Sequence, residues 1–176
     1  MKWGLAILIG VLAVVGAAAV YAGNDAAEHA SAVLKDPAGE IIGDARFVED
    51  SAGIVHVNVH VKGLSPGEHG IHIHAIGACT PTFAAAGPHH NPLGHQHGLE
   101  NPLGPHAGDL EALIVNGNGV GHLNTQTDLA TLSAGQTGIF DADGSALVIH
   151  ALPDDQTTDP SGNSGSRIAC GAIEAD

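Results

Sequence analysis

Hydrophobic and polar residues alternate along most of the chain beyond residue 30, and this period of two predicts β-strands. The segment 54–61 reads IVHVNVHV, in which valine alternates with histidine and asparagine. Such alternation buries one face of a strand and leaves the other face in water. No segment after residue 30 predicts a helix. The other predicted strands cover residues 31–35, 40–47, 71–76, 110–115, 120–125, 138–140, 146–152 and 167–173.

Short turn motifs separate these strands. DPAG at residues 36–39 and NGNG at residues 116–119 predict hairpins, and DADG at residues 141–144 predicts a third. Of these nine candidate ranges we expect seven or eight to form strands, and that many short antiparallel strands indicate a β-sandwich or barrel. Residues 77–109 and 153–166 show no hydrophobic period and predict two long loops. Ordered loops of that length usually carry function.

The composition limits which residue types can form the core and which classes of partner the protein can bind. Hydrophobic residues make up 44% of the chain but aromatic residues only 3%, so the core must consist mainly of valine, isoleucine, leucine and alanine. Five basic and 19 acidic residues give a net charge of −14, which excludes a nucleic-acid partner, because phosphate binding needs lysine and arginine patches. The chain has 13 histidines, and this bias suggests metal binding.

The N-terminus predicts export. Lys2 precedes an uncharged stretch at residues 3–22, which fits either a cleaved signal peptide or a membrane tether. We expect a leader at residues 1–22, a linker at residues 23–29 and one domain at residues 30–176. Both interpretations place that domain outside the cytoplasm, whether periplasmic, secreted or tethered to the outer face of the membrane. In an exported protein the only two cysteines, Cys79 and Cys170, predict one disulfide.

Six histidines and one aspartate form an ordered pattern that suits two metals. His72 and His74 share one face of a strand, since residues two apart on a strand point the same way. Three imidazoles and a carboxylate suit tetrahedral zinc, whereas four imidazoles favour copper(II). One histidine can belong to both sets if it bridges the two metals. The zinc set is His89, His97, His106 and Asp109, and the copper set is His72, His74, His89 and His150.

In six stretches the chain resembles the copper/zinc superoxide dismutases, in particular the secreted bacterial type. The resemblance runs from about residue 30 to the C-terminus. It implies a flattened eight-stranded antiparallel Greek-key barrel with two long functional loops, holding one copper and one zinc per subunit. The matching stretches are GEHGIHIH (67–74), AGPHHNP (86–92), HG (97–98), HAGDL (106–110), LVIHALPDD (147–155) and GNSGSRIACG (162–171).

The resemblance also implies a reaction and residue roles. Superoxide is converted to O₂ and hydrogen peroxide by alternating reduction and reoxidation of copper, which is bridged to a structural zinc through His89. Position by position, the two ligand sets above match those of the family, and so does the Cys79–Cys170 disulfide. Asp154 matches a carboxylate that links the two metal sites, and Arg167 matches the guanidinium that attracts superoxide. Arg167 and His89 are thus the expected catalytic residues.

Some features lie outside this match or depart from it. The loop at 153–166 contains no lysine, so attraction of the anion rests almost wholly on Arg167. His69 is expected to be structural, and the remaining histidines are expected to face solvent, with incidental or secondary metal binding as the lesser alternative: His90, His95, His29, His56, His60 and His122. A non-catalytic copper carrier or store of the same fold is the alternative, but it is expected to lack a copper ligand or the arginine. Whether the chain forms a homodimer stays open.

Overall fold

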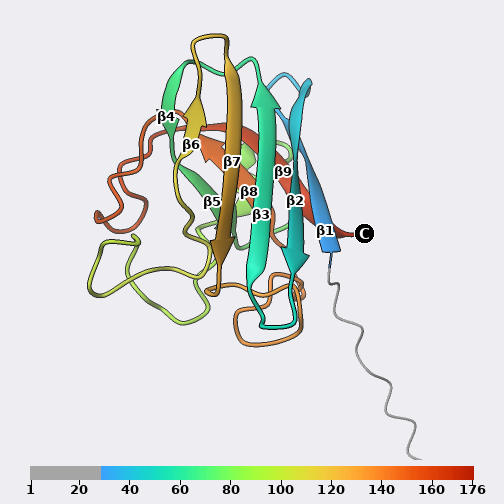
Figure 1. Cartoon of the computed structure of the whole chain (residues 1–176), viewed down its shortest axis with the longest axis vertical. Helices are drawn as coiled ribbons and strands as arrows, with labels where there is room; N and C mark the ends of the chain where they lie inside the picture. Colours follow the sequence, from blue (N-terminus) through green and yellow to red (C-terminus); the bar gives the residue numbers. More distant parts are fainter. Residues whose placement is uncertain (1–28) are drawn as a thin grey trace, which may run out of the picture.

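This computed structural model describes residues 29–176, which contain nine β-strands and one short 3₁₀ helix (Figure 1). Within these residues, no helix is long and apolar enough to cross a membrane. The expected leader lies outside the described residues, and β1 begins at His29, the last residue of the expected linker. The elements are β1 (His29–Lys35), β2 (Ile41–Glu49), β3 (Val55–Lys62), β4 (Gly67–His69), β5 (Ile71–His74), η1 (Phe83–Ala86), β6 (Leu113–Val115), β7 (Val120–Thr127), β8 (Ala146–His150) and β9 (Arg167–Ala175).

The sheet nearly closes into a barrel because its two edge strands follow each other directly in the sequence. The strand order is β4-β6-β7-β3-β2-β1-β9-β8-β5, and every neighbouring pair is antiparallel. β4 and β5 stand at opposite ends of this order, yet only Gly70 separates them in the sequence. The sheet therefore rolls up and nearly closes. If β4 and β5 are counted as one interrupted strand, the barrel has eight strands, as the resemblance implies. The predicted all-β barrel is confirmed.

Two of the three predicted hairpins are confirmed. DPAG joins β1 to β2, and NGNG joins β6 to β7. The third prediction is wrong: residues 138–140 are not a strand and make only an isolated bridge from Gly138 to Thr131. The reason is that β8 already pairs with β5 on one edge and β9 on the other, which leaves no free edge for a hairpin partner.

The core has the expected composition. Along β3, Val55, Val57, Val59 and Val61 are buried, while the residues between them are exposed. Valine, isoleucine, leucine and alanine form most of the main cluster, with Phe47 as its fully buried aromatic side chain. Each fully buried valine, leucine or isoleucine side chain stabilises the fold by about 1.5–3 kcal/mol relative to the same side chain exposed to water.

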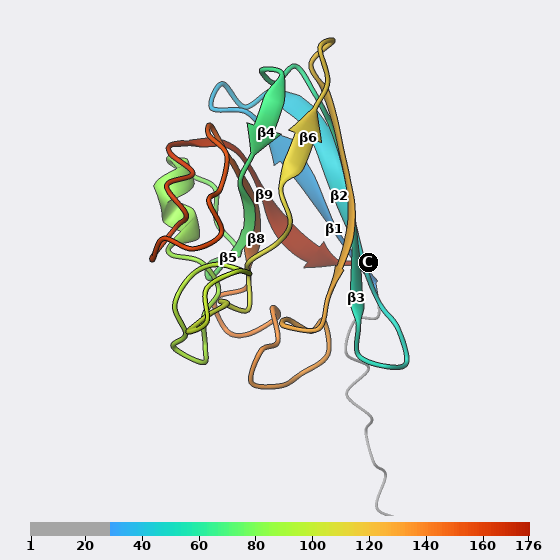
Figure 2. The same cartoon turned by 60° about the vertical axis from the view of Figure 1, so that its left-hand side comes forward.

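The two long loops pack on the same side of the barrel, beside β5 and β8 (Figure 2). Backbone hydrogen bonds hold the first loop against β5: the Ile73 amide donates to Gly108 O at 2.8 Å, and the His90 amide donates to Ile73 O at 2.9 Å. Gly98 has a φ of +111°, and a Cβ there would overlap the carbonyl of Gln156 in the second loop. The two loops therefore touch each other as well as the barrel, which brings distant histidines together.

Candidate metal centre

Four side chains point one donor atom each at a common position in the first long loop. Asp109 Oδ1 lies 2.9 Å from His97 Nδ1, 3.1 Å from His89 Nδ1 and 3.5 Å from His106 Nδ1. His89 Nδ1 and His106 Nδ1 are 3.4 Å apart. Ligands about 2.0–2.1 Å from a tetrahedral zinc ion are separated by about 3.3 Å. The spacing of these donor atoms therefore fits zinc, and the structure brings together the whole predicted zinc set.

Asp109 is held as an ionised ligand by its second oxygen. Asp109 Oδ2 accepts hydrogen bonds from the amides of Gly98 at 2.8 Å and His106 at 2.9 Å. Burial raises the pKa of Asp109, but hydrogen bonds from the rings of the neighbouring histidines and from the Gly98 amide outweigh burial and bring the pKa well below its usual range. Asp109 thus offers a negative charge to a cation at neutral pH.

The predicted copper set lies beside the zinc set. One ring nitrogen from each of the four histidines falls within 4.8 Å of the others, and all four side chains are buried. His74 donates from Nδ1 to Gly87 O at 2.9 Å, and His150 donates from Nδ1 to Gly165 O at 3.2 Å. In a neutral imidazole the other nitrogen then carries a lone pair. The Nε2 atoms of His74 and His150 face each other at 3.4 Å with no proton to share.

Two further nitrogens in this set have no partner among the described residues. They are His72 Nδ1 and His89 Nε2, and both are buried. Burial lowers the pKa of His72 to about 3 and that of His150 to about 4, so these rings are neutral at physiological pH. Buried polar atoms without a partner are rare in proteins. A metal ion that accepts four lone pairs would satisfy all of these atoms at once, which is the fit that copper requires.

His89 lies between the two sets. Its Nδ1 faces Asp109, its Nε2 is buried without a partner among the described residues, and its ring stacks on His72 of the copper set with ring centroids 3.9 Å apart. Because the sets adjoin here, donor atoms of His72 also fall within 4.8 Å of His89, His97 and Asp109. His106 lies against the same atoms, because His106 Nδ1 faces both His89 Nδ1 and Asp109 Oδ1.

A buried carboxylate from the second loop connects the sets. Asp154 Oδ2 accepts from His72 Nε2 at 2.6 Å, and Asp154 Oδ1 accepts from His97 Nε2 at 3.0 Å. Hydrogen bonds from these two rings and from the Gln156 amide outweigh burial, so the pKa of Asp154 lies below its usual range. Asp154 thus orients one histidine of each set, which is the place that the resemblance predicts for it.

Gly162 leaves the space that Asp154 occupies. Its φ is +58°, and a Cβ there would overlap the Asp154 carboxylate. We expect Gly162→Ala to displace Asp154 and to weaken metal retention about 10–100-fold, the usual cost of losing a partner that orients a ligand. Dialysis against a competing chelator, followed by elemental analysis, measures this. Gly117→Ala is the matched control, because a Cβ at Gly117 meets nothing within 4 Å. Equal retention by the two variants would contradict the role assigned to Gly162.

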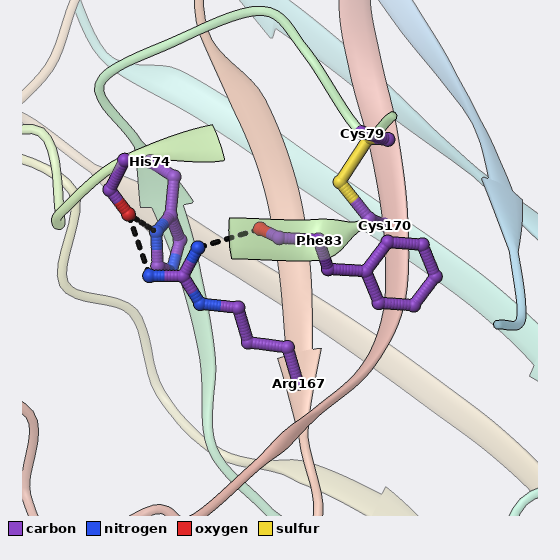
Figure 3. Close-up of a disulfide and its surroundings, with 6 residues drawn as sticks. His74, Cys79, Phe83, Arg167 and Cys170 are labelled. Atoms are coloured by element: carbon purple, nitrogen blue, oxygen red, sulfur yellow. Dashed lines mark hydrogen bonds between the residues drawn. A yellow bond between two sulfur atoms is a disulfide. The ribbon is translucent and has the colours of Figure 1, made fainter. Parts of the chain in front are cut away.

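Arg167 is anchored beside the copper set (Figure 3). Its Nη1 donates to Phe83 O at 2.6 Å, and its Nη2 donates to Gly87 O at 2.6 Å. Gly87 O also accepts the hydrogen bond from His74 Nδ1, so one carbonyl positions both the guanidinium and a copper-set histidine. Burial lowers the pKa of Arg167, but a guanidinium stays charged at neutral pH. A fixed positive charge therefore lies next to the four histidines.

The predicted disulfide is confirmed. Cys79 and Cys170 are joined, although they are 91 positions apart in the sequence. The bond ties the loop that carries Phe83 to β9, the strand on which Arg167 lies (Figure 3). It therefore holds the donor and the acceptors of the Arg167 hydrogen bonds in one unit.

Comparison with known proteins identifies the family. Residues 41–173 match the family model described as copper/zinc superoxide dismutase. The chain belongs to the copper/zinc superoxide dismutase family. It is 44% identical over 147 residues to Cu-Zn superoxide dismutase 2 of Aquifex aeolicus, covering 82% of this chain and 85% of that protein. It is 38% identical over 149 residues to the Cu-Zn superoxide dismutase of Caulobacter vibrioides, covering 82% and 85%.

Solved structures of relatives have the same fold. A SOD-like protein from Bacillus subtilis superposes with a TM-score of 0.74 at 37% identity, over 81% of this chain and 96% of that chain. The clock protein EA4 superposes with a TM-score of 0.77 at 34% identity, over 88% and 98%. The enzymatic relatives and the histidine groups together make this chain a superoxide dismutase, an oxidoreductase with copper and zinc as its metals.

The remaining histidines near the centre have structural contacts. His69 is buried, with Nδ1 2.7 Å from His150 O and Nε2 2.9 Å from Ser65 O. The prediction that His90 faces solvent is wrong: it is buried, and its Nε2 lies 3.2 Å from Thr137 O. Neighbouring residues in an extended segment point to opposite sides, so while His89 faces the metals, His90 packs under the segment before β8. His95 is exposed, as predicted.

Backbone carbonyls and amides also orient the side chains of the centre, and the sequence motifs did not predict them. The carbonyls of Gly87 and Gly165 select which nitrogen of His74 and His150 keeps its proton. The Gly98 amide holds Asp109. Glycine in the motifs was the only available signal, and it does not tell which carbonyl or amide will face a ligand.

Proposed function

We propose that the chain disproportionates superoxide into O₂ and hydrogen peroxide at this double centre. The observation that carries the proposal is that two donor sets meet at His89: its Nδ1 lies 3.1 Å from Asp109 Oδ1, its Nε2 is buried without a hydrogen-bond partner among the described residues, and the ring also belongs to the group of four histidines. When bound, copper supplies a one-electron couple that takes an electron from one superoxide and gives one to the next, and zinc keeps a constant oxidation state. We assign copper to His72, His74, His89 and His150, and zinc to His89, His97, His106 and Asp109.

His89 is suited to handle a proton in this reaction. Its Nδ1 is held toward Asp109, while its Nε2 is buried without a hydrogen-bond partner in the described part of the chain. Nε2 can therefore take a proton when it is not a ligand, and it can return that proton toward the product. The zinc set keeps the ring in place throughout, and Asp154 keeps the neighbouring His72 and His97 aligned.

Arg167 is the residue that we assign to attraction of the anion. The chain has a net charge of −14, so its overall field repels superoxide, and only a local positive charge can attract it. The second loop adds no lysine, and its Asp155 and Asp159 are acidic. The guanidinium beside His74 is thus the main cationic side chain at the centre.

We expect Arg167→Ala to lower the second-order rate of dismutation about tenfold or more at low ionic strength, and to weaken its dependence on salt. Arg46→Ala is a matched control, because it removes the same charge from an exposed position on β2, where the side chain is 78% exposed. Stopped-flow decay of superoxide at several salt concentrations measures both variants. An unchanged rate for Arg167→Ala at low salt would refute the role of the guanidinium.

One experiment tests the proposed function as a whole. Superoxide decay is measured with the purified protein after loading with copper and zinc, and bound metals are counted by elemental analysis. Fast, copper-dependent turnover with about one copper and one zinc per chain supports the proposal. Full metal occupancy without turnover would instead indicate a copper carrier or store, the alternative that the complete ligand set and Arg167 disfavour.

We also propose that the domain works outside the cytoplasm. The disulfide supports this, because such bonds persist mainly in oxidising compartments. The uncharged stretch at residues 3–22 would serve as a cleaved signal peptide or as a tether to the membrane. Cell fractionation with N-terminal sequencing distinguishes the two, since cleavage near residues 20–22 would leave a soluble chain. Recovery in the cytoplasm with residues 1–22 intact would contradict export.

A further inference from the structure

Two histidines outside the metal centre form a pair on the outer face of the barrel. His60 of β3 and His122 of β7 are directly opposite each other in the antiparallel register. Their rings stack with centroids 4.3 Å apart and planes inclined by 17°. Both residues are exposed. β3 and β7 lie side by side in Figure 1, and this part of the sheet lies across the barrel from the two long loops in Figure 2.

The two rings are free to act together. Among residues 29–176, neither ring makes a hydrogen bond or an ion pair with another side chain, and both residues are exposed. Side chains directly opposite each other on antiparallel strands have Cβ atoms about 4.5–5.5 Å apart. Exposed imidazoles at this separation can turn about their side-chain torsions and present one nitrogen each to a single ion. Water can fill the rest of its coordination shell.

The charges around the pair favour a cation with affinity for nitrogen. Asp44 of β2 is directly opposite His60, so Asp44, His60 and His122 form a row across three strands. Asp44 is 57% exposed, and its only ion pair in the described residues is a loose one at 4.0 Å with Arg46. Lys62, two residues further on the same exposed face of β3, adds one positive charge, but the chain as a whole carries a net charge of −14 with this lysine included. The Asp44 carboxylate therefore offers charge compensation, or an oxygen ligand, beside the pair.

We propose that His60 and His122 bind one divalent transition-metal ion on the outer face of the barrel. Each contributes one ring nitrogen, and the Asp44 carboxylate supports the ion. Imidazole ligands suit copper(II), nickel(II) and zinc, and the usual order of affinities places copper(II) first. With two histidines open to water, this site binds more weakly than the buried centre and exchanges its metal with solution. The proposal does not depend on the dismutase function.

Titration of the metal-loaded protein with additional copper(II) tests the site. With the buried centre already filled with copper and zinc, calorimetry should detect one further copper(II) per chain, and electron paramagnetic resonance should show coupling to two nitrogens. We expect His60→Asn and His122→Asn each to weaken this binding about tenfold or more, and to reduce the coupling to one nitrogen. Dismutase activity should be unchanged in both variants.

His56→Asn provides the matched control. His56 lies on the same strand and the same exposed face, but Gln126 rather than a histidine is opposite it. This variant should bind the additional copper(II) as the unmodified protein does. Three results would each overturn the proposal: no further copper(II) bound by the unmodified protein, binding unchanged in His60→Asn and His122→Asn, or an equal loss in His56→Asn.

Discussion

Replacement of His74 by alanine is expected to abolish superoxide dismutation while zinc remains bound. His74 belongs only to the copper set, and its Nε2 faces His150 Nε2 at 3.4 Å. The substitution removes one of four nitrogen donors and leaves a buried gap that water can enter. It also removes one of the two hydrogen bonds that Gly87 O accepts, the one from His74, and leaves the one from Arg167. The loss of activity should exceed the roughly 10–100-fold typical of residues that only orient a ligand.

The decisive comparison is between bound metals and rate. Elemental analysis of His74→Ala should show copper lost and zinc retained, because His89, His97, His106 and Asp109 are untouched. His95→Ala is the control: it removes an exposed histidine of the first long loop, whose Nδ1 has Pro105 O, at 3.0 Å, as its one hydrogen-bond partner among the described residues. We expect this control to keep both metals and its activity. Full copper content and an undiminished rate in His74→Ala would refute the assignment of the copper set.

Removal of the disulfide is expected to destabilise the fold by about 4–5 kcal/mol, as loop-closure entropy predicts for a link across 91 positions. The double variant Cys79→Ser with Cys170→Ser should therefore unfold at a clearly lower denaturant concentration. Activity should fall too, because the released loop carries the Phe83 and Gly87 carbonyls that hold Arg167. Equilibrium unfolding and dismutase assays measure the two effects.

Reduction of the unmodified protein provides the control for the disulfide. Under a thiol reductant its unfolding midpoint should approach that of the double variant, whereas the midpoint of the variant should not respond to the reductant. If the double variant instead has the same unfolding midpoint and the same dismutation rate as the oxidised protein, the bond has neither a stabilising nor a positioning role. Comparison at equal metal content is essential, since bound metals stabilise the folded state by mass action.

Local patterns predicted the strands well and their long-range partners poorly. The alternation in β3 and the turn chemistry of DPAG and NGNG depend on neighbouring residues, so they could be read directly. The hairpin expected at DADG failed because the edges of β8 are taken by β5 and β9, which come from distant parts of the chain. The prediction that His90 faces solvent failed for a similar reason. The segment around Thr137, which covers His90, is far away in the sequence, so local patterns could not reveal the contact.

The sequence by itself determined the all-β class, the disulfide partners and the set of side chains able to serve as ligands, because residue type, order and turn chemistry are properties of the chain. Only the tertiary structure decided how those side chains work together. The proton on each imidazole depends on a carbonyl or carboxylate from another segment, such as Gly87 for His74 and Asp154 for His72. The stacked pair His60 and His122 likewise depends on the register between β3 and β7. Such relations exist only after distant segments pack, because hydrogen bonds and metal donor sets require atoms within a few ångströms of one another.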